Sequence, residues 1–116
     1  MENSNELLLD AAESGDSVTL LKALSVGAEV DAKTQGGWTA SMWAANKGHV
    51  DCLALLLKAR ADVEAKDFEG WTASMRAANN GHLDGVQMIE AEIERRALLK
   101  EVAAPSPSKS KSTLRV

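Results

Sequence analysis

The sequence predicts an all-α fold of stacked helix–turn–helix units, and three observations support this prediction. Residues 37–51 return 33 positions later as residues 70–84, with twelve of the fifteen positions identical. The run Ala-Glu-Val-Asp-Ala-Lys at 28–33 has a close counterpart at 61–66, again 33 positions on. Aromatic residues make up only 3% of the chain, so alanine, leucine and valine must build the core. A period of this length is the mark of a repeat array.

Each repeated segment starts with the pattern of a short helix. Thr39 can cap a helix, because its side-chain oxygen can accept a backbone N–H from the first turn. Residues 40–47 then form the helix, and Gly48 ends it, since glycine adopts the left-handed conformation without steric penalty. A second helix follows, with an apolar face at helical spacing that consists of Leu53, Leu56 and Leu57.

Between these units the chain makes an extended excursion. In residues 28–33 and 61–66, valine and alanine alternate with acids, which is typical of an extended finger. The tip of each finger is the turn that precedes Gly37 or Gly70.

Taken together, these features resemble the ankyrin repeat over about residues 5–90. The match depends on the period, on the Gly-His joints at 48–49 and 81–82, and on the Ala-Asp-Val exit at 61–63. The resemblance implies an ankyrin-repeat solenoid whose units carry β-turn fingers. We expect residues 1–104 to form one domain, divided into repeats at about 5–36, 37–69 and 70–104.

Two departures from the ankyrin pattern lead to predictions. Arg60 stands where Gly27 stands one unit earlier, so a non-glycine residue is expected to adopt a positive φ at a cost of ~1–2 kcal/mol. The family's Pro-Leu-His is replaced by Ala-Ser-Met, which places Ser41 and Ser74 where Leu8 stands in the first unit. We expect each serine hydroxyl to bond a carbonyl one turn earlier, and the next residue, a methionine, to fill part of the lost volume.

The two ends of the array differ from its middle. Residues 5–15 lack a preceding Gly-Trp-Thr turn and have polar neighbours, as a capping unit requires, and Asp16 can cap the next helix. The last helix begins at Leu83 and continues far beyond one unit, with Glu92 and Arg96 placed at i, i+4. We interpret it as an extended C-terminal capping helix. A coiled-coil seam is the alternative, but about two heptads of pattern fall short of the three or four it requires.

Charge and cysteine content limit the compartment and the class of partner. The formal net charge is −4, and residues 105–116 hold three basic residues and no acid, so residues 1–104 carry −7. This acidic body argues against nucleic-acid binding, although the Ser/Pro/Lys-rich tail at 105–116, which we expect to be disordered, is basic. Cys52 is the only cysteine, so no intramolecular disulfide can form. With no apolar run near ~18 residues, we expect no membrane span and a cytoplasmic location, the nucleus being the alternative.

No group of residues in the sequence suggests catalysis. His49 and His82 occupy the same joint in successive units, whereas a zinc site needs three or four ligands converging within ~2.3 Å of one metal. We expect each ring nitrogen to bond backbone at its joint. The glycines follow the repeat and do not cluster into a phosphate-binding loop. We therefore predict no enzyme, no cofactor and no metal.

The resemblance instead implies a surface that binds another protein. Ankyrin-like proteins use the finger tips and the exposed side of the first helix in each unit, and all four aromatic residues of this chain fall there. Tryptophan and arginine are also the types most enriched at interface hot spots. Carried over residue by residue, the expected partner-binding set is Gln35, Trp38, Trp43, Asn46, Lys47, Phe68, Glu69, Trp71, Arg76, Asn79 and Asn80.

Alternatives remain open for this surface. Trp38 and Trp71 either bind the partner or pack across the stack, and a cation–π contact between Trp43 and Arg76 is a third interpretation. The predicted function is a non-catalytic protein-interaction module that acts as a monomer. A regulatory or inhibitory subunit that blocks an enzyme's site is the alternative, and nucleic-acid binding through the basic tail is the least favoured. The sequence does not identify the partner.

Overall fold

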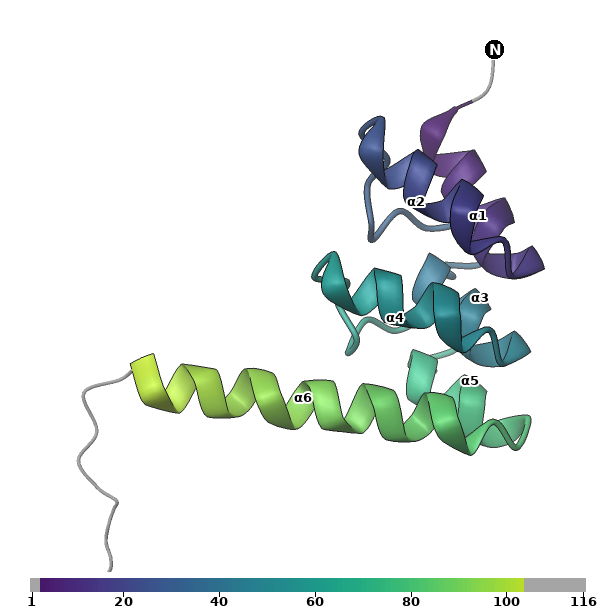
Figure 1. Ribbon diagram of the computed structural model, residues 1–116. Helices are drawn as coiled ribbons and strands as arrows, with labels where there is room; N and C mark the ends of the chain where they lie inside the picture. Colours follow the sequence, from purple (N-terminus) through teal and green to yellow (C-terminus); the bar gives the residue numbers. More distant parts are fainter. Residues whose placement is uncertain (1–2, 104–116) are drawn as a thin grey trace, which may run out of the picture.

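The structure is a computed structural model that describes residues 3–103, with the backbone alone for 101–103. In this part of the chain, six helices form three stacked pairs (Figure 1). The described part contains no strand, and the all-α repeat solenoid predicted from the sequence is confirmed. The pairs are α1 (Ser4–Ser14) with α2 (Ser17–Ser25), α3 (Ala40–Lys47) with α4 (Val50–Lys58), and α5 (Ala73–Asn79) with α6 (Leu83–Ala103).

The first helices of the pairs form one layer and the second helices form another. α3 packs between α1 and α5, and α4 packs against both α2 and α6. Finger 1 (residues 28–38) connects the first pair to the second, and finger 2 (residues 61–71) connects the second pair to the third. The largest fully buried apolar side chains come from all three pairs, and they are Leu8, Leu20, Met42, Leu53, Leu56 and Ile89.

The helix ends form as the sequence predicts. The Thr39 hydroxyl accepts an N–H of the first turn of α3 at 3.3 Å, and Thr72 caps α5 in the same way. α3 ends at Gly48, whose φ of 78° is left-handed. In the first pair, Asp16 caps α2 by accepting the hydroxyl and the N–H of Thr19, and these hydrogen bonds lower the pKa of Asp16.

The predicted left-handed residue after α4 is confirmed. Arg60 has a φ of 71°, and no other non-glycine residue in the described part has a positive φ. The equivalent Gly27 has a φ of 101°. The backbone at this joint therefore follows the repeat even where the side chain opposes it, at ~1–2 kcal/mol.

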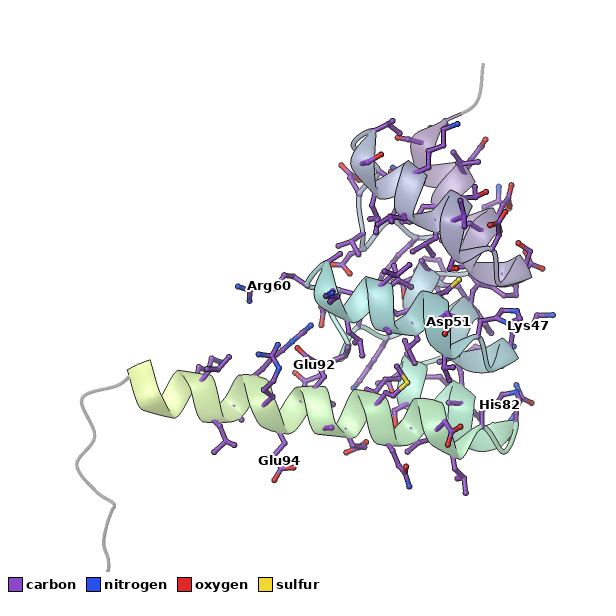
Figure 2. All side chains as sticks on the ribbon, in the orientation of Figure 1. Lys47, Asp51, Arg60, His82, Glu92 and Glu94 are labelled. Carbon is purple, nitrogen blue, oxygen red and sulfur yellow. The ribbon has the colours of Figure 1, made fainter. Side chains whose placement is uncertain are left out.

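α6 continues well past the point at which α2 and α4 end (Figure 1). Arg96 holds the second half of α6, because it donates to the carbonyl of Ala61, the first residue of finger 2, and to the Glu92 carboxylate, both at 2.7 Å. The predicted i, i+4 pair is thus confirmed. Figure 2 shows Glu92 directed toward the stack and Glu94 directed away from it. The predicted disordered tail at 105–116 lies outside the described residues.

The predictions for the two serines are wrong in part. Ser41 is buried, and its hydroxyl has no hydrogen-bond partner among the described residues. The Ser74 hydroxyl donates to the carboxylate of Glu90 at 3.2 Å, because α6 carries an acid at the position where α4 carries Leu57. Met42 is buried as expected, but Met75 is 50% exposed, since no further unit covers α5 within residues 3–103.

The histidines lie at the joints between successive pairs. His49 Nε2 is 3.1 Å from the carbonyl oxygen of Glu13, which confirms the backbone bond expected for this residue. His82 makes no such bond in the part of the chain described. The corresponding carbonyl, that of Asn46, accepts the side-chain amide of Asn80 instead, at 2.9 Å.

Candidate functional site

Both finger tips are closed by the same hydrogen-bonded turn. In finger 1 the Thr34 hydroxyl accepts the N–H groups two and four residues later, each at 3.3 Å. In finger 2 one carboxylate oxygen of Asp67 accepts the two corresponding N–H groups at 2.9 and 3.0 Å. Short polar side chains form such turns because they reach their own backbone. The turns place Trp38 and Trp71 at equivalent positions on the two fingers.

The guanidinium of Arg76 lies between these two tryptophan rings. Its Cζ is 4.5 Å from the ring centroid of Trp38 and 4.5 Å from that of Trp71. Arg76 also donates through Nε to Asp67 at 3.0 Å and through Nη2 to Glu69 at 2.7 Å. A cation over an indole is attracted by the negative face of the ring. Arg76 of the third pair therefore joins a tryptophan of finger 1 to finger 2.

Asp67 is the buried anchor of this arrangement. Its side chain is fully buried, whereas that of Arg76 is 13% exposed and that of Glu69 is 74% exposed. Burial acts to raise the pKa of Asp67, but the N–H groups of the turn and the Arg76 guanidinium bond the carboxylate and hold its pKa below the ordinary value. For Arg76, burial acts to lower the pKa, but Glu69 and Asp67 hold it above the ordinary value. Both groups are therefore charged at neutral pH.

Trp43 extends the line of rings on the side of the second pair. Its ring centroid is 4.5 Å from that of Trp38, with the planes tilted by 43°, which is a favourable arrangement for two aromatic rings. Of the alternatives that the sequence left open, the cation–π interaction of Arg76 forms with Trp38 and Trp71 and not with Trp43. We call Trp43, Trp38, Arg76 and Trp71 the aromatic stack.

The other predicted residues flank the aromatic stack. Phe68 is 75% exposed at the tip of finger 2, with one edge of its ring against Gly37 of finger 1. Asn80 and Asn46 bond each other and join the C-terminal ends of α5 and α3. Figure 2 shows Lys47 directed away from the helices. The remaining members of the set are exposed, as Lys47 is, and they are Gln35 and Asn79.

Asp67 is the residue that sequence reasoning missed. A signal was present, because at the 33-residue offset Thr34 is replaced by Asp67 and Trp43 is replaced by Arg76. Thr34 and Asp67 close the same turn, so only the second carboxylate oxygen is new, and that oxygen binds Arg76. The two replacements are complementary: the second pair of helices carries a neutral combination and the third carries a charged one.

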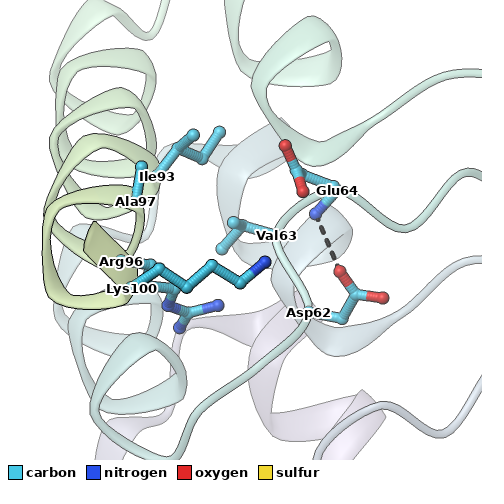
Figure 3. Close-up of a pocket in the computed structure, with 7 residues that line it drawn as sticks. All are labelled: Asp62, Val63, Glu64, Ile93, Arg96, Ala97 and Lys100. Carbon is cyan, nitrogen blue, oxygen red and sulfur yellow. Dashed lines mark hydrogen bonds between the residues drawn. The ribbon is translucent and has the colours of Figure 1, made fainter. Parts of the chain in front are cut away.

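A groove of about 400 Å³ lies between finger 2 and α6 (Figure 3). Acidic side chains lie on its finger side and basic ones on its α6 side, with apolar groups between them. Such an open groove of mixed charge is better suited to a peptide chain than to an enclosed small ligand. Its lining residues are Asp62, Val63, Glu64, Ile93, Arg96, Ala97 and Lys100.

The described residues offer little for other chemistry. Residues 3–103 contain no group of three or more histidine, cysteine, aspartate or glutamate side chains that could hold a metal ion. Cys52 is buried, and burial raises the pKa of its thiol, which disfavours the nucleophilic thiolate. Among the helices that the structure describes, none is long and apolar enough to cross a membrane.

Comparison with known proteins agrees with this architecture. A family model described as "Ankyrin repeats (3 copies)" matches residues 8–97, which is more than half of the chain, and the resemblance seen in the sequence is confirmed. No curated protein matches the chain.

Proposed function

The chain belongs to the ankyrin-repeat family, whose members are generally protein–protein interaction modules, and we propose that it binds a partner protein through the aromatic stack and the finger tips. The observation that carries this proposal is the line of Trp43, Trp38, Arg76 and Trp71 across two units. Tryptophan and arginine dominate interface hot spots, and the only other aromatic residue, Phe68, lies on the adjoining finger tip.

The residues of this surface have different roles in the proposal. Phe68 and Glu69 contact the partner, because their side chains are about three-quarters exposed, at 75% and 74%. Trp43 and Trp71, at the two ends of the aromatic stack, offer ring surface to the partner. Arg76 is 13% exposed and positions the rings rather than contacting the partner directly. The rim of the surface consists of Gln35, Asn46, Lys47, Asn79 and Asn80.

The proposed module is non-catalytic and comprises residues 1–104. An interaction module and an inhibitory subunit would use the same surface, so they differ only in what the partner does. If the partner is an enzyme, its turnover in the presence of this protein separates the two cases: inhibition identifies a regulatory subunit, and unchanged turnover identifies a scaffold.

The experiment that tests the proposal is affinity purification from native extract with immobilised full-length protein. Partners are identified by mass spectrometry for the unmodified chain, for Trp43→Ala and for Val18→Ala, a matched control on α2 whose side chain is 78% exposed. A partner of this surface is retained by the unmodified chain and by Val18→Ala but depleted with Trp43→Ala. Equal retention by all three proteins contradicts the proposed surface.

A further inference from the structure

One side of finger 1 is covered by finger 2. Two acceptors of finger 1, the Asp31 carboxylate and the Gly36 carbonyl, accept the N–H groups of Asp62 and Phe68 of finger 2, at 2.8 and 3.2 Å. In return, Lys33 donates through Nζ to a carbonyl of finger 2 at 3.2 Å. Finger 2, with its turns at residues 63–64 and 68–69, therefore lies along finger 1 and offers it two N–H donors and one carbonyl acceptor.

Two side chains complete this cover. The Phe68 ring lies so close to Gly37 that a Cβ at that glycine would be 2.6 Å from it. The guanidinium of Arg76 covers the ring of Trp38. One aromatic side chain and one arginine, carried by the next unit, thus occupy the tip of finger 1.

The same side of finger 2 is uncovered within residues 3–103. A Cβ added at Gly70, the equivalent of Gly37, would meet nothing within 4 Å. Trp71 has Arg76 on its ring, and no second aromatic ring or guanidinium is stacked on it in the described part. We call this side the free edge, and its residues, each 33 positions after a covered one, are Glu64, Lys66, Glu69, Gly70 and Trp71.

A complete further repeat unit does not fit this end of the molecule. In the second pair, Leu57 of α4 packs against the core, but the equivalent residue of α6 is Glu90, which is exposed and accepts the Ser74 hydroxyl. A unit stacked on α6 would bury this carboxylate, and burying an ionised group without a charged partner is strongly unfavourable. The free edge is therefore open to a finger-like segment, whereas the helical end beside it is not open to a helix pair.

A second copy of this chain is also a poor occupant. Its finger 2 is already engaged with its own finger 1, and its finger 1 carries Gln35 and Trp43 at the positions of Phe68 and Arg76. It therefore supplies neither the aromatic side chain at the tip nor the guanidinium.

We infer that the free edge binds a finger-like segment of the partner protein that carries an aromatic side chain and an arginine. The aromatic ring packs on Gly70 and the guanidinium stacks on the open face of Trp71. The Glu69 carbonyl and the Glu64 carboxylate accept N–H groups of the segment, and Lys66 donates to one of its carbonyls. This inference rests on the proposed function and specifies the chemistry of the partner.

Charge favours the same kind of segment. Among residues 61–71, Asp62 and Glu64 are exposed acids and Lys66 is an exposed base, while the exposed Glu69 is paired with Arg76. A basic segment is therefore attracted to this surface, and an acidic one is repelled. The groove of Figure 3, which Asp62 and Glu64 also line, provides about 400 Å³ at the base of finger 2 for the segment to continue.

The molecule supplies the probe that tests this inference. Residues 61–76 contain the finger 2 backbone, Phe68 and Arg76, so a fluorescein-labelled peptide of this sequence copies the segment that covers finger 1. We expect it to bind the full-length protein with a dissociation constant below about 1 mM in a fluorescence anisotropy titration. Peptides with Phe68→Ala or Arg76→Gln should each bind at least about fivefold more weakly. Equal binding of a scrambled peptide, or no binding at 1 mM, overturns the inference.

Substitutions in the protein locate the peptide. Glu64→Gln and Trp71→Leu in the protein should weaken its binding of the unmodified peptide. Val18→Ala should leave this binding unchanged. Because Trp71→Leu also removes a contact with Arg76, amide NMR of the unmodified protein provides a second measurement. Peptide addition should shift the amides of residues 64–71 and the Trp71 indole N–H, leaving those of α1 and α2 in place. Shifts confined to α1, α2 or finger 1 contradict the inference.

The inference and the proposed function can fail separately. A partner depleted by Trp43→Ala supports the proposed surface, whatever the peptide does. If this partner binds unmodified protein equally well with and without saturating peptide, the free edge is not its site. The inference is then wrong while the proposed function stands.

Discussion

The guanidinium of Arg76 stacks on the ring of Trp38, a residue 38 positions earlier in the chain, at 4.5 Å. The same guanidinium is fixed by the buried Asp67, so a residue that the sequence marks as a surface hot spot also links two units. We therefore expect substitutions at Arg76 to affect stability as well as binding, and those at the exposed Phe68 to affect mainly binding.

Replacing Arg76 should destabilise the fold unless Asp67, its ion-pair partner, is replaced as well. Arg76→Trp copies Trp43 of the second unit but leaves Asp67 buried and unpaired, and we expect a loss of about 2 kcal/mol or more in the free energy of unfolding. The double variant Asp67→Thr/Arg76→Trp restores the combination found at Thr34 and Trp43 and should recover most of this loss.

Urea unfolding of the single and double variants measures this coupling. Glu69→Gln is the matched control, since its 74% exposed carboxylate should contribute less than about 1 kcal/mol. Strictly additive effects of the two substitutions would show that Asp67 and Arg76 do not act as a pair.

Gly85→Ala should stabilise the protein. Gly85 lies in the first turn of α6, and an added Cβ would stand in ordinary contact with Ala77 at 3.5 Å and with Leu53 at 3.6 Å. Because alanine loses less backbone entropy than glycine in a helix, we expect a gain of about 0.5–1 kcal/mol in thermal or urea unfolding.

The neighbouring glycine serves as the control of opposite sign. A Cβ added at Gly81 would meet nothing within 4 Å, but the φ of Gly81 is 75°, which is left-handed. Gly81→Ala should therefore lower the free energy of unfolding by about 1 kcal/mol or more. A loss of stability at both positions would show that the space beside Gly85 is smaller than the contacts indicate.

Ser41→Ala should also raise the free energy of unfolding, by about 1 kcal/mol. The Ser41 hydroxyl is buried and has no hydrogen-bond partner in the described residues, so its removal ends a desolvation penalty and improves helix propensity. Ser74→Ala, at the equivalent position one unit later, loses the hydrogen bond to Glu90, so its free energy of unfolding should not rise. Calorimetry of the two variants measures the difference, and equal shifts would mean that the Ser41 hydroxyl is satisfied in solution.

The contribution of Glu92 should depend on pH in a defined window. The hydrogen bond from Arg95 lowers the pKa of Glu92 to about 2, against burial, and Arg96 adds to the effect. Since the pKa is lowered in the folded protein, the stabilisation is complete above the ordinary value of 4.5 and is lost as pH falls toward 2.

The measurement compares unfolding midpoints of the unmodified protein and Glu92→Gln at several pH values. We expect the unmodified protein to be more stable at pH 7 and the difference to shrink between pH 4.5 and 2. Glu94→Gln, on the opposite side of α6 in Figure 2, removes a carboxylate from the same helix but leaves Glu92 in place, and it serves as the control. A difference that stays constant with pH would contradict the role of the Glu92 carboxylate.

The sequence predicted the parts of the fold that repeat. Thr39, Gly48 and Arg60 each act through the local backbone, so their conformations could be inferred from pattern and spacing alone. The predictions were less accurate where a contact depends on which unit comes next. Met75 is exposed because no further unit covers α5 within residues 3–103, and Ser74 bonds Glu90 because α6 carries an acid where α4 carries Leu57.

The sequence predicted which residues form the candidate site but not which of their side chains contact one another. The positions of Trp38, Trp71 and Arg76 followed from the repeat, yet the order in which their side chains stack depends on side-chain directions that spacing does not fix. Comparison of Thr34 with Asp67 could have shown that the third unit gained an acid to match its arginine. The uncovered side of finger 2 could also have been inferred, because the last helix was predicted to continue where a further finger would otherwise begin.

The most direct test of the proposed binding surface is the affinity of a purified partner for Trp43→Ala and for Val18→Ala, measured by isothermal titration at a temperature at which both variants are fully folded. Trp43 ends the aromatic stack on α3, and Val18 is an exposed apolar residue on α2. We predict that Trp43→Ala weakens binding by about 2 kcal/mol or more, as hot-spot residues do, and that Val18→Ala leaves binding unchanged. Unchanged affinity for Trp43→Ala, with a lower unfolding midpoint, would show that the aromatic stack serves stability alone and that the partner binds elsewhere.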